Sequence, residues 1–370
     1  MANSFGMPKI KITFESLGLS AIRRSERGIA LLILRDEGFT GKEKSFTYRS
    51  LAEVPGITGE GESPYKFSEE NEKYIRLAFA GEPWRLRVEV VDETDRPLSD
   101  LLASLELEKF NYYSMPGQTP EDQDLILSWH KDINQRKDKT IKFIGYDEPA
   151  DHKRWINWTV PYVVYDGIRY EGAEFTAMLA SAFAGLDLQR SGPYFDFWGK
   201  IEDAELPFVD DEDEAVNEGK LFLTYDGDNY KLSRAVNSLV THTAIVGEDQ
   251  SKIRIVDAMD LIADDIRDTF AKEYVGKVLN TYDNKEQFLA LIHRVYFPPL
   301  HDQVPEATAN NRVDIDMEAH RGWIITRGQE PDDMTETEIR TYNTGSNVFL
   351  VGRLSLLDAM EDLVINFKLD

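Results

Sequence analysis

The six histidines of the chain are the first side chains to test for metal or acid–base chemistry. No two of them stand at the HExxH or HxH spacing by which a helix or strand offers two imidazoles to one zinc ion. The chain has no cysteine, so thiolate ligands, thiol nucleophiles and disulfides are excluded. The sequence therefore predicts no metal centre. The histidines are His130, His152, His242, His293, His301 and His320.

Motifs for nucleophilic catalysis or phosphate binding are also missing. There is no Gly-x-Ser-x-Gly elbow and no GxxxxGK[ST] loop, and Gly59-Glu60-Gly61 stands in a segment that we predict to be a plain loop. Asp226 and Asp228 in YDGDN could suggest calcium, but the EF-hand spacing and its closing glutamate are absent, which favours a hairpin turn. We therefore expect no cofactor and no enzymatic activity.

Composition narrows the choice of partners. The 370 residues carry a net charge of −25 and are 42% hydrophobic, which is enough for more than one core. Direct contact with nucleic acid is not expected, because neutralising phosphates needs clustered Lys and Arg. The longest apolar run, residues 29–34, is too short to span a bilayer, and the N-terminus lacks a signal-peptide pattern. We expect a soluble protein made in a cytoplasm.

The elements that would position any site alternate between strands and helices in the first two-thirds of the chain. This order predicts a mainly parallel sheet with covering helices. Residues 202–218 hold nine acids and no Lys or Arg, and are predicted to be a solvated loop. Strands are expected at 27–34, 85–91, 110–116 and 140–145, with more strands in 156–172, and helices at 68–81, 98–108, 119–136 and 173–187.

After residue 247 the pattern turns helical. The longest stretch, 253–280, has an apolar face and several aspartates elsewhere. Further helices are predicted at 284–297, 316–328 and 335–342, with a strand at 347–357. His293 lies on a mostly apolar helix and is expected to be packed or interfacial rather than catalytic.

Each end of the chain carries an alternating strand pattern with one apolar face. A terminal strand has unpaired backbone groups, which can be satisfied by its own molecule or by the sheet edge of another chain. The residues alone leave both possibilities open. The apolar positions are Ile10, Ile12 and Phe14 near the N-terminus, and Ile365, Phe367 and Leu369 at the C-terminus.

Several long segments resemble the contractile phage tail sheath proteins. VDIDMEAHRGWIITRG and the run from NTGSNVFLVGRLSLL through DAMEDLVINF are similar to their C-terminal domain, and RAVNSL and KFNYYSMPG also match. The resemblance is strongest to sheaths of PBSX-like prophages and of diffocins. It covers nearly the whole chain and is weakest at 36–65, 146–155 and 188–218.

The resemblance implies an α+β, multidomain fold. An α/β sheath domain of the kind described as subtilisin-like would be joined to an α+β C-terminal domain, with terminal strand arms that augment the sheets of neighbouring subunits. The domains implied are an arm at 1–20, a β-rich segment at 21–83, the sheath domain at 84–246, an inner domain at 247–357 and an arm at 358–370.

The resemblance also implies a function: a subunit that polymerises helically around a tail tube and contracts to drive the tube through a cell envelope. Its partners would be further copies of itself, the tube protein, and baseplate and tail terminator proteins, with no direct contact to nucleic acid or membrane. Assembly would take place in the bacterial host cytoplasm, before release as part of a virion tail or tail-like particle. Two alternatives stay open, a non-contractile structural or adhesive protein and, less favoured, an α/β enzyme.

Two further sets of residues follow from this interpretation. Segments that join the arms to the body are expected to act as hinges. A helix around 257–276 is expected to face the tube, unless its charges simply face water. The hinge candidates are Ser16, Gly18, Asp358, Glu361 and Asp362, and the tube-facing candidates are Asp260, Asp264, Asp265, Asp268 and Lys272.

Overall fold

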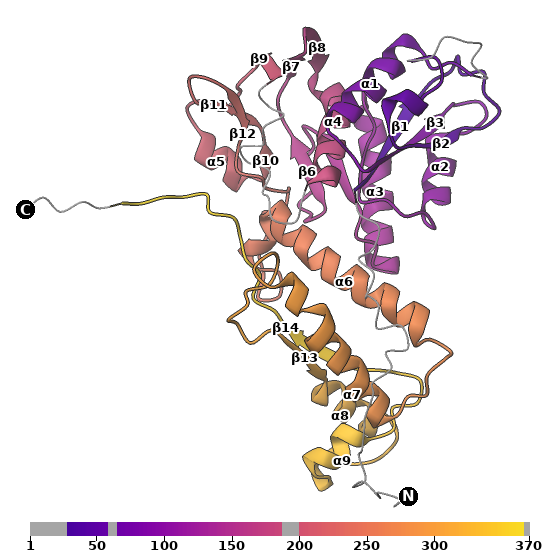
Figure 1. Ribbon diagram of the computed structural model, residues 1–370, viewed down its shortest axis with the longest axis vertical. Coiled ribbons are helices and arrows are strands. Elements are labelled where there is room, and N and C mark those ends of the chain that lie inside the picture. The colour runs from indigo at the N-terminus through magenta and orange to yellow at the C-terminus, as the bar shows by residue number, and fades with distance from the viewer. Residues whose placement is uncertain (1–27, 58–64, 187–199, 366–370) are drawn as a thin grey trace, which may run out of the picture. The chain divides into compact units, whose positions relative to one another are not determined.

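A computed structural model describes residues 28–57, 65–186 and 200–365 of the chain (Figure 1). The described residues fall into two compact units. The larger unit holds residues up to Asp264 together with the segment from Leu356, and the smaller unit holds Asp265–Ser355. The long helix α6, Ile253–Glu273, contributes to both.

A seven-stranded sheet forms the centre of the larger unit, in the order β10-β6-β5-β4-β1-β3-β2. All neighbouring pairs are parallel except β2 with β3. The predicted parallel sheet is therefore confirmed, with one antiparallel edge strand. The strands are β1 Ile29–Arg35, β2 Ser45–Tyr48, β3 Arg85–Val91, β4 Tyr112–Ser114, β5 Lys142–Tyr146, β6 Trp155–Trp158 and β10 Lys220–Leu221.

Helices cover both faces of this sheet. Strand β1 shows the division, since Leu32 belongs to one apolar cluster and Leu31 to the other. The first cluster includes residues of α1 and α4, and the second includes residues of α2 and α3. Alternate side chains of a buried strand point to opposite faces, which explains why this run is apolar throughout. The helices are α1 Glu69–Ala80, α2 Leu98–Leu105, α3 Pro120–Lys137 and α4 Gly172–Gly185.

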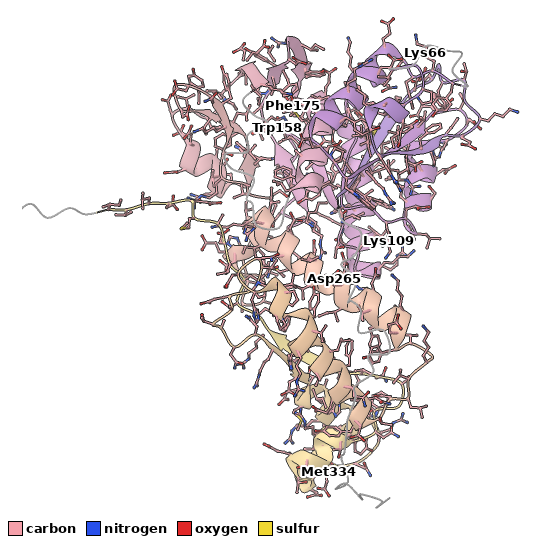
Figure 2. All side chains as sticks on the ribbon, in the orientation of Figure 1. Lys66, Lys109, Trp158, Phe175, Asp265 and Met334 are labelled. Carbon is pink, nitrogen blue, oxygen red and sulfur yellow. The ribbon has the colours of Figure 1, made fainter. Side chains whose placement is uncertain are left out.

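Helices α1 and α3 begin close to where the sequence predicts, each after a residue whose side chain caps the helix N-terminus. Ser68 caps α1 by accepting a hydrogen bond from the backbone N–H of Asn71. Thr119 and Asp122 form a reciprocal capping box at the start of α3. Inside the unit, Trp158 and Phe175 stack with ring centroids 5.9 Å apart (Figure 2).

Two small sheets and a short helix complete the larger unit. β7 Tyr162–Tyr165 pairs with β8 Ile168–Glu171 and β9 Ile201–Ala204, and β11 Leu223–Tyr225 pairs with β12 Tyr230–Leu232. The β11–β12 hairpin confirms the turn predicted at Asp226-Gly227. The acidic loop prediction is wrong in part, because 212–217 form the helix α5, Glu212–Asn217. Acids in a first helical turn interact favourably with the helix dipole.

The described part of the smaller unit consists of helices and one antiparallel pair of strands that lie far apart in the sequence. β13 and β14 are antiparallel. Thr335 and Glu338 form a capping box at the start of α9, within the helix predicted at 335–342. The elements are the end of α6, α7 Tyr282–Leu291, a π-helical turn Ile292–Tyr296, α8 Met317–Thr326, α9 Glu336–Thr341, β13 Arg312–Ile315 and β14 Leu350–Arg353.

Two predicted element boundaries differ from the structure. α6 ends at Glu273 rather than 280, and the chain then turns through Gly276, whose φ of +71° is left-handed. The strand predicted at 347–357 is confined to β14. β1, β2 and β3 lie in one sheet, so strands from the predicted β-rich segment 21–83 pair with a strand from the region predicted to begin at 84. The domain division itself stays a prediction.

Candidate functional site

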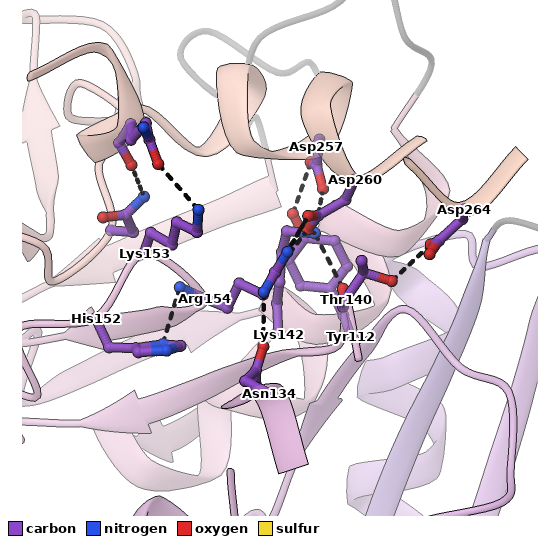
Figure 3. A network of polar contacts seen from close by, with 12 residues as sticks. Tyr112, Asn134, Thr140, Lys142, His152, Lys153, Arg154, Asp257, Asp260 and Asp264 are labelled. Atoms are coloured by element: carbon purple, nitrogen blue, oxygen red, sulfur yellow. Dashed lines mark hydrogen bonds and ion pairs between the residues drawn. The ribbon is translucent and has the colours of Figure 1, made fainter. Parts of the chain in front are cut away.

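A connected group of polar side chains in the larger unit joins the first half of α6 to the sheet (Figure 3). Asp257 and Asp260 stand one turn apart on α6 and share a face of the helix. They meet Lys142 at the start of β5 and Arg154, which directly precedes β6. We call these four residues the α6 clamp.

Both cations of the clamp converge on Asp260. Lys142 Nζ lies 2.6 Å from Asp260 Oδ2 and 3.0 Å from Asp257 Oδ1. Arg154 Nη2 donates to Asp260 Oδ1 at 2.6 Å. Asp260 is 2% exposed and Lys142 is 3% exposed, so these charges are removed from water and depend on each other.

A second layer of hydrogen bonds holds Arg154 in place. Its Nη1 donates to Asn134 Oδ1 at 2.8 Å, and its backbone N–H donates to His152 Nδ1 at 3.2 Å. The His152 ring lies edge-on to His130, with centroids 5.1 Å apart, and His130 Nδ1 is 2.9 Å from the hydroxyl of Tyr113. The arginine is thereby fixed from α3, from its own loop and from α6.

The protonation states follow from burial and the neighbouring cations. Burial alone would raise the pKa of Asp260, but Lys142 and Arg154 outweigh it and hold that pKa below its usual value. Burial and then the charge of Arg154 lower the pKa of His152 to about 4. The pKa of fully buried His130 is lowered well below its usual value, again chiefly by burial. Both histidines are therefore neutral at neutral pH.

The aspartates predicted to face a tube are placed differently from one another. Asp260 is inside the clamp and Asp265 is buried and accepts a hydrogen bond from Tyr296 at 2.9 Å, so neither presents a charge at the surface of this chain. Asp264 accepts a 2.6 Å hydrogen bond from Thr140 and is half-buried. Asp268 is half-buried and Lys272 is exposed. Tube contact stays a prediction for the last three.

Sequence reasoning missed the cationic half of the clamp. Lys142 interrupts an otherwise apolar strand, and a lysine at such a position signals a buried ion pair. Arg154 and Asn134 carry no comparable pattern in the sequence. Helical periodicity placed Asp260 away from the apolar face of 253–280, but it did not single out Asp257, and it could not say whether Asp260 met protein or solvent.

The C-terminal hinge candidates bind cations of the larger unit. Asp362 accepts two hydrogen bonds from Arg234 Nη2, at 2.7 and 2.8 Å. Glu361 Oε2 lies 3.4 Å from Arg234 Nε and 4.0 Å from Lys252 Nζ. Asp358 forms an ion pair with Lys252. Whether the segment bends there stays a prediction.

Residues 363–365 are extended and exposed, as the yellow end of the ribbon shows in Figure 1. Leu363 and Val364 are 83% and 84% exposed, and Ile365 is 57% exposed. The remaining arm and hinge candidates lie outside the described residues. These are Ile10, Ile12, Phe14, Ser16, Gly18, Phe367 and Leu369.

Within the described ranges, no three His, Asp or Glu residues are grouped so as to hold a metal ion. His293 Nε2 accepts a hydrogen bond from the backbone N–H of Val313, which gives it a structural partner. No helix in the described part of the chain is long and apolar enough to cross a membrane.

Comparison with known proteins shows where this architecture occurs. No protein-family model matches the chain. The tail sheath protein of Clostridium phage phiCD119 is 32% identical over 375 aligned residues, covering 98% of this chain and 99% of its own length. XkdK of the phage-like element PBSX in Bacillus subtilis is 21% identical, covering 64% of this chain and 53% of its own length. The contracted helical sheath of the anti-feeding prophage superposes with a TM-score of 0.67 at 12% identity, covering 99% of this chain and 100% of that one.

Proposed function

The chain belongs to the tail sheath protein family. From this premise we propose that it polymerises helically around a tail tube. Contraction of the polymer would then drive the tube through a target cell envelope. The chain is a structural sheath subunit of a phage tail or tail-like particle. The observation that carries the proposal is similarity to a tail sheath protein along nearly the whole chain. We infer that its role is non-catalytic, with the energy for contraction stored in contacts formed at assembly.

The clamp supports movement of the larger unit as one body. Subunits of a contracting polymer exchange one set of intersubunit contacts for another while each keeps its own core. Asp260, held between Lys142 and Arg154, ties the first half of α6 to strands of the central sheet. A buried ion pair of this kind costs several kcal/mol to break, roughly 3–5 kcal/mol, so it resists internal rearrangement.

The exposed end of the chain supports pairing with a neighbour. Leu363, Val364 and Ile365 expose adjacent apolar side chains to solvent, which is typical of a surface that binds another protein. In the proposed polymer, the strand pattern that follows Asp362 adds to the sheet edge of an adjacent subunit. An open filament needs such head-to-tail contacts, since they do not close into a ring.

The remaining partners follow from the same proposal. The tube would meet α6 through Asp264, Asp268 and Lys272, and the ends of the polymer would meet baseplate and tail terminator proteins. Assembly would occur in the bacterial host cytoplasm. No direct contact with nucleic acid or membrane is proposed.

Electron microscopy of the purified protein with and without tail tubes tests polymerisation and the role of the C-terminal strand. The parent should form striated tubes or polysheath. The variant I365S/F367S/L369S, which removes the apolar face of the strand, should form none while its larger unit stays folded. The matched variant N366S/K368S/D370S changes the opposite face and should still assemble. Ordered tubes from the first variant would contradict the strand-pairing proposal.

A further inference from the structure

We propose that Arg234 and Lys252 form an electrostatic anchor that positions the C-terminal segment and releases it when the charges are screened. The anchor would decide where the apolar end of the chain begins and in which direction it leaves the larger unit. This inference deepens the proposed function, because it takes residues beyond Asp362 to be the arm that pairs with a neighbour.

The two cations are held in a fixed relation by backbone hydrogen bonds. Arg234 follows β12, and Lys252 directly precedes α6. Val236 and Lys252 form an antiparallel bridge, and the backbone N–H of Ile253 donates to the carbonyl of Ala235 at 3.1 Å. The pair is therefore pre-organised before the C-terminal segment binds, which lowers the entropy cost of docking.

Three carboxylates of the segment match these two cations. Arg234 forms ion pairs with Asp362 and Glu361. Lys252 forms an ion pair with Asp358, and its Nζ lies 4.0 Å from Glu361 Oε2. Glu361 thus lies between the two cations and its side chain is 14% exposed. A network in which one acid serves two cations gains more than isolated surface pairs do.

Apolar packing contributes little to holding this segment. None of the residues 356–365 is buried, and Met360 is fully exposed. Glu361 and Asp362 also border a cavity of about 430 Å³ whose other walls include Phe222, Leu232 and Arg234. Leu356, Leu357 and Ala359 are only half-buried, so the ion pairs supply most of the attachment of this segment to the larger unit.

Attachment by charge makes the anchor sensitive to ionic strength. The Arg234 and Asp362 side chains are 37% and 76% exposed, so salt can screen their attraction. At 1 M salt the Debye length falls to about 3 Å, close to the separation of the charges themselves. At low salt the ion pairs would therefore hold the segment in one position on the larger unit. Because they are partly exposed, they would also be weak enough for the segment to detach and pair with another subunit.

A distance measurement on the full-length monomer tests the anchor. The chain has no cysteine, so spin labels can be attached to L363C and S99C without competing sites. Ser99 is exposed on α2, in the same unit as the anchor. The labelled parent should give a narrow distance distribution at low salt and a broad one at 1 M salt.

Charge variants separate the anchor from general effects of salt. R234D/K252D should lower the docked population roughly tenfold or more at low salt. A tenfold change in the docking equilibrium corresponds to a loss of about 1.4 kcal/mol of binding free energy. The swap R234D/D362R should restore part of the narrow distribution. R136D, which removes another arginine paired with two carboxylates, Glu106 and Asp132, should leave the distribution unchanged.

A broad distribution in the parent at low salt, or no change in R234D/K252D, would overturn the proposal. The measurement needs no polymer, so its outcome is independent of whether the protein assembles into tubes. If the anchor is confirmed and no tubes form, the proposed function is at fault. If tubes form but the segment is not anchored, only this inference fails.

Discussion

The guanidinium of Arg154 holds the carboxylate of Asp260 with two nitrogens, Nη2 at 2.6 Å from Oδ1 and Nε at 3.1 Å from both oxygens. Arg154 belongs to the loop before β6, while Asp260 lies on α6, more than a hundred positions later in the sequence. This contact adds a buried charge interaction to the apolar packing of α6, so its removal should change the stability of the larger unit.

Replacing Asp260 with alanine should strongly destabilise the larger unit. The change leaves Lys142 and Arg154 buried without their shared carboxylate, and losing one partner of a buried pair costs about 3–5 kcal/mol. D132A, which removes an exposed partner of Arg136, should cost about 1 kcal/mol or less. Urea unfolding followed by hydrogen exchange of β5 peptides measures both. A loss below about 1 kcal/mol in D260A would show that the clamp is not holding α6.

Stability should fall as the pH drops from 6.5 to 4 because of the buried histidines. The pKa of His152 is lowered to about 4, so in this window the unfolded chain binds a proton that the folded chain rejects. The contribution is fully present above pH 6.5 and is lost on acidification, by on the order of 3 kcal/mol for His152 at pH 4. His130, whose pKa is also lowered, acts in the same direction.

The variant H152Q isolates this effect in urea titrations at pH 7 and pH 4.5. It should lose less stability between the two pH values than the parent, while H242Q, at an exposed histidine, should behave like the parent. The carboxylate of Asp260 does not interfere, because its lowered pKa keeps its contribution intact until the pH falls below about 4. An identical pH response in H152Q and the parent would refute the prediction.

A methyl group at Gly81 should separate α1 from α4. A Cβ there would meet the backbone N of Ala182 at 2.7 Å and the carbonyl oxygen of Met178 at 2.8 Å. The φ of Gly81 is −78°, so backbone strain plays no part and only the contact counts. G81A should cost about 1–3 kcal/mol by urea unfolding. G247A, where nothing lies within 4 Å, should be near neutral, and equal effects would contradict the reasoning.

The elements that could be predicted from the sequence are those specified by a local pattern of neighbouring residues. The apolar run of β1, the helix starts near Ser68 and Thr119, and the turn at Gly227 are local signals, and the structure confirms them. The prediction of a loop over 202–218 was wrong in part, because a high density of charge indicates solvent exposure but does not exclude a short helix. α5 is exposed for most of its length and helical at once.

The clamp and the anchor could not be predicted because both join segments far apart in the sequence. Arg234 and Asp362 stand 128 positions apart, and no spacing rule connects them. The resemblance located both segments, RAVNSL and LDAMED, without indicating that they touch. The aspartates of α6 illustrate the same limit, since periodicity grouped Asp260 with Asp264 although their partners differ.

Reversing the charge of Lys272 should weaken assembly on tail tubes if the end of α6 faces the tube. Lys272 is exposed in the last turn of α6, where a cation also favours the helix dipole. K272E should therefore lower the stability of the helix by a few tenths of a kcal/mol. If the end of α6 faces the tube, K272E should also need a higher subunit concentration than the parent to sheathe the same amount of tube. K137E changes a last-turn lysine of α3 and controls for the helix effect. Co-sedimentation with purified tubes measures the difference, which should shrink at high salt because exposed charges are screened. Equal sheathing by K272E and K137E would place the tube on another surface.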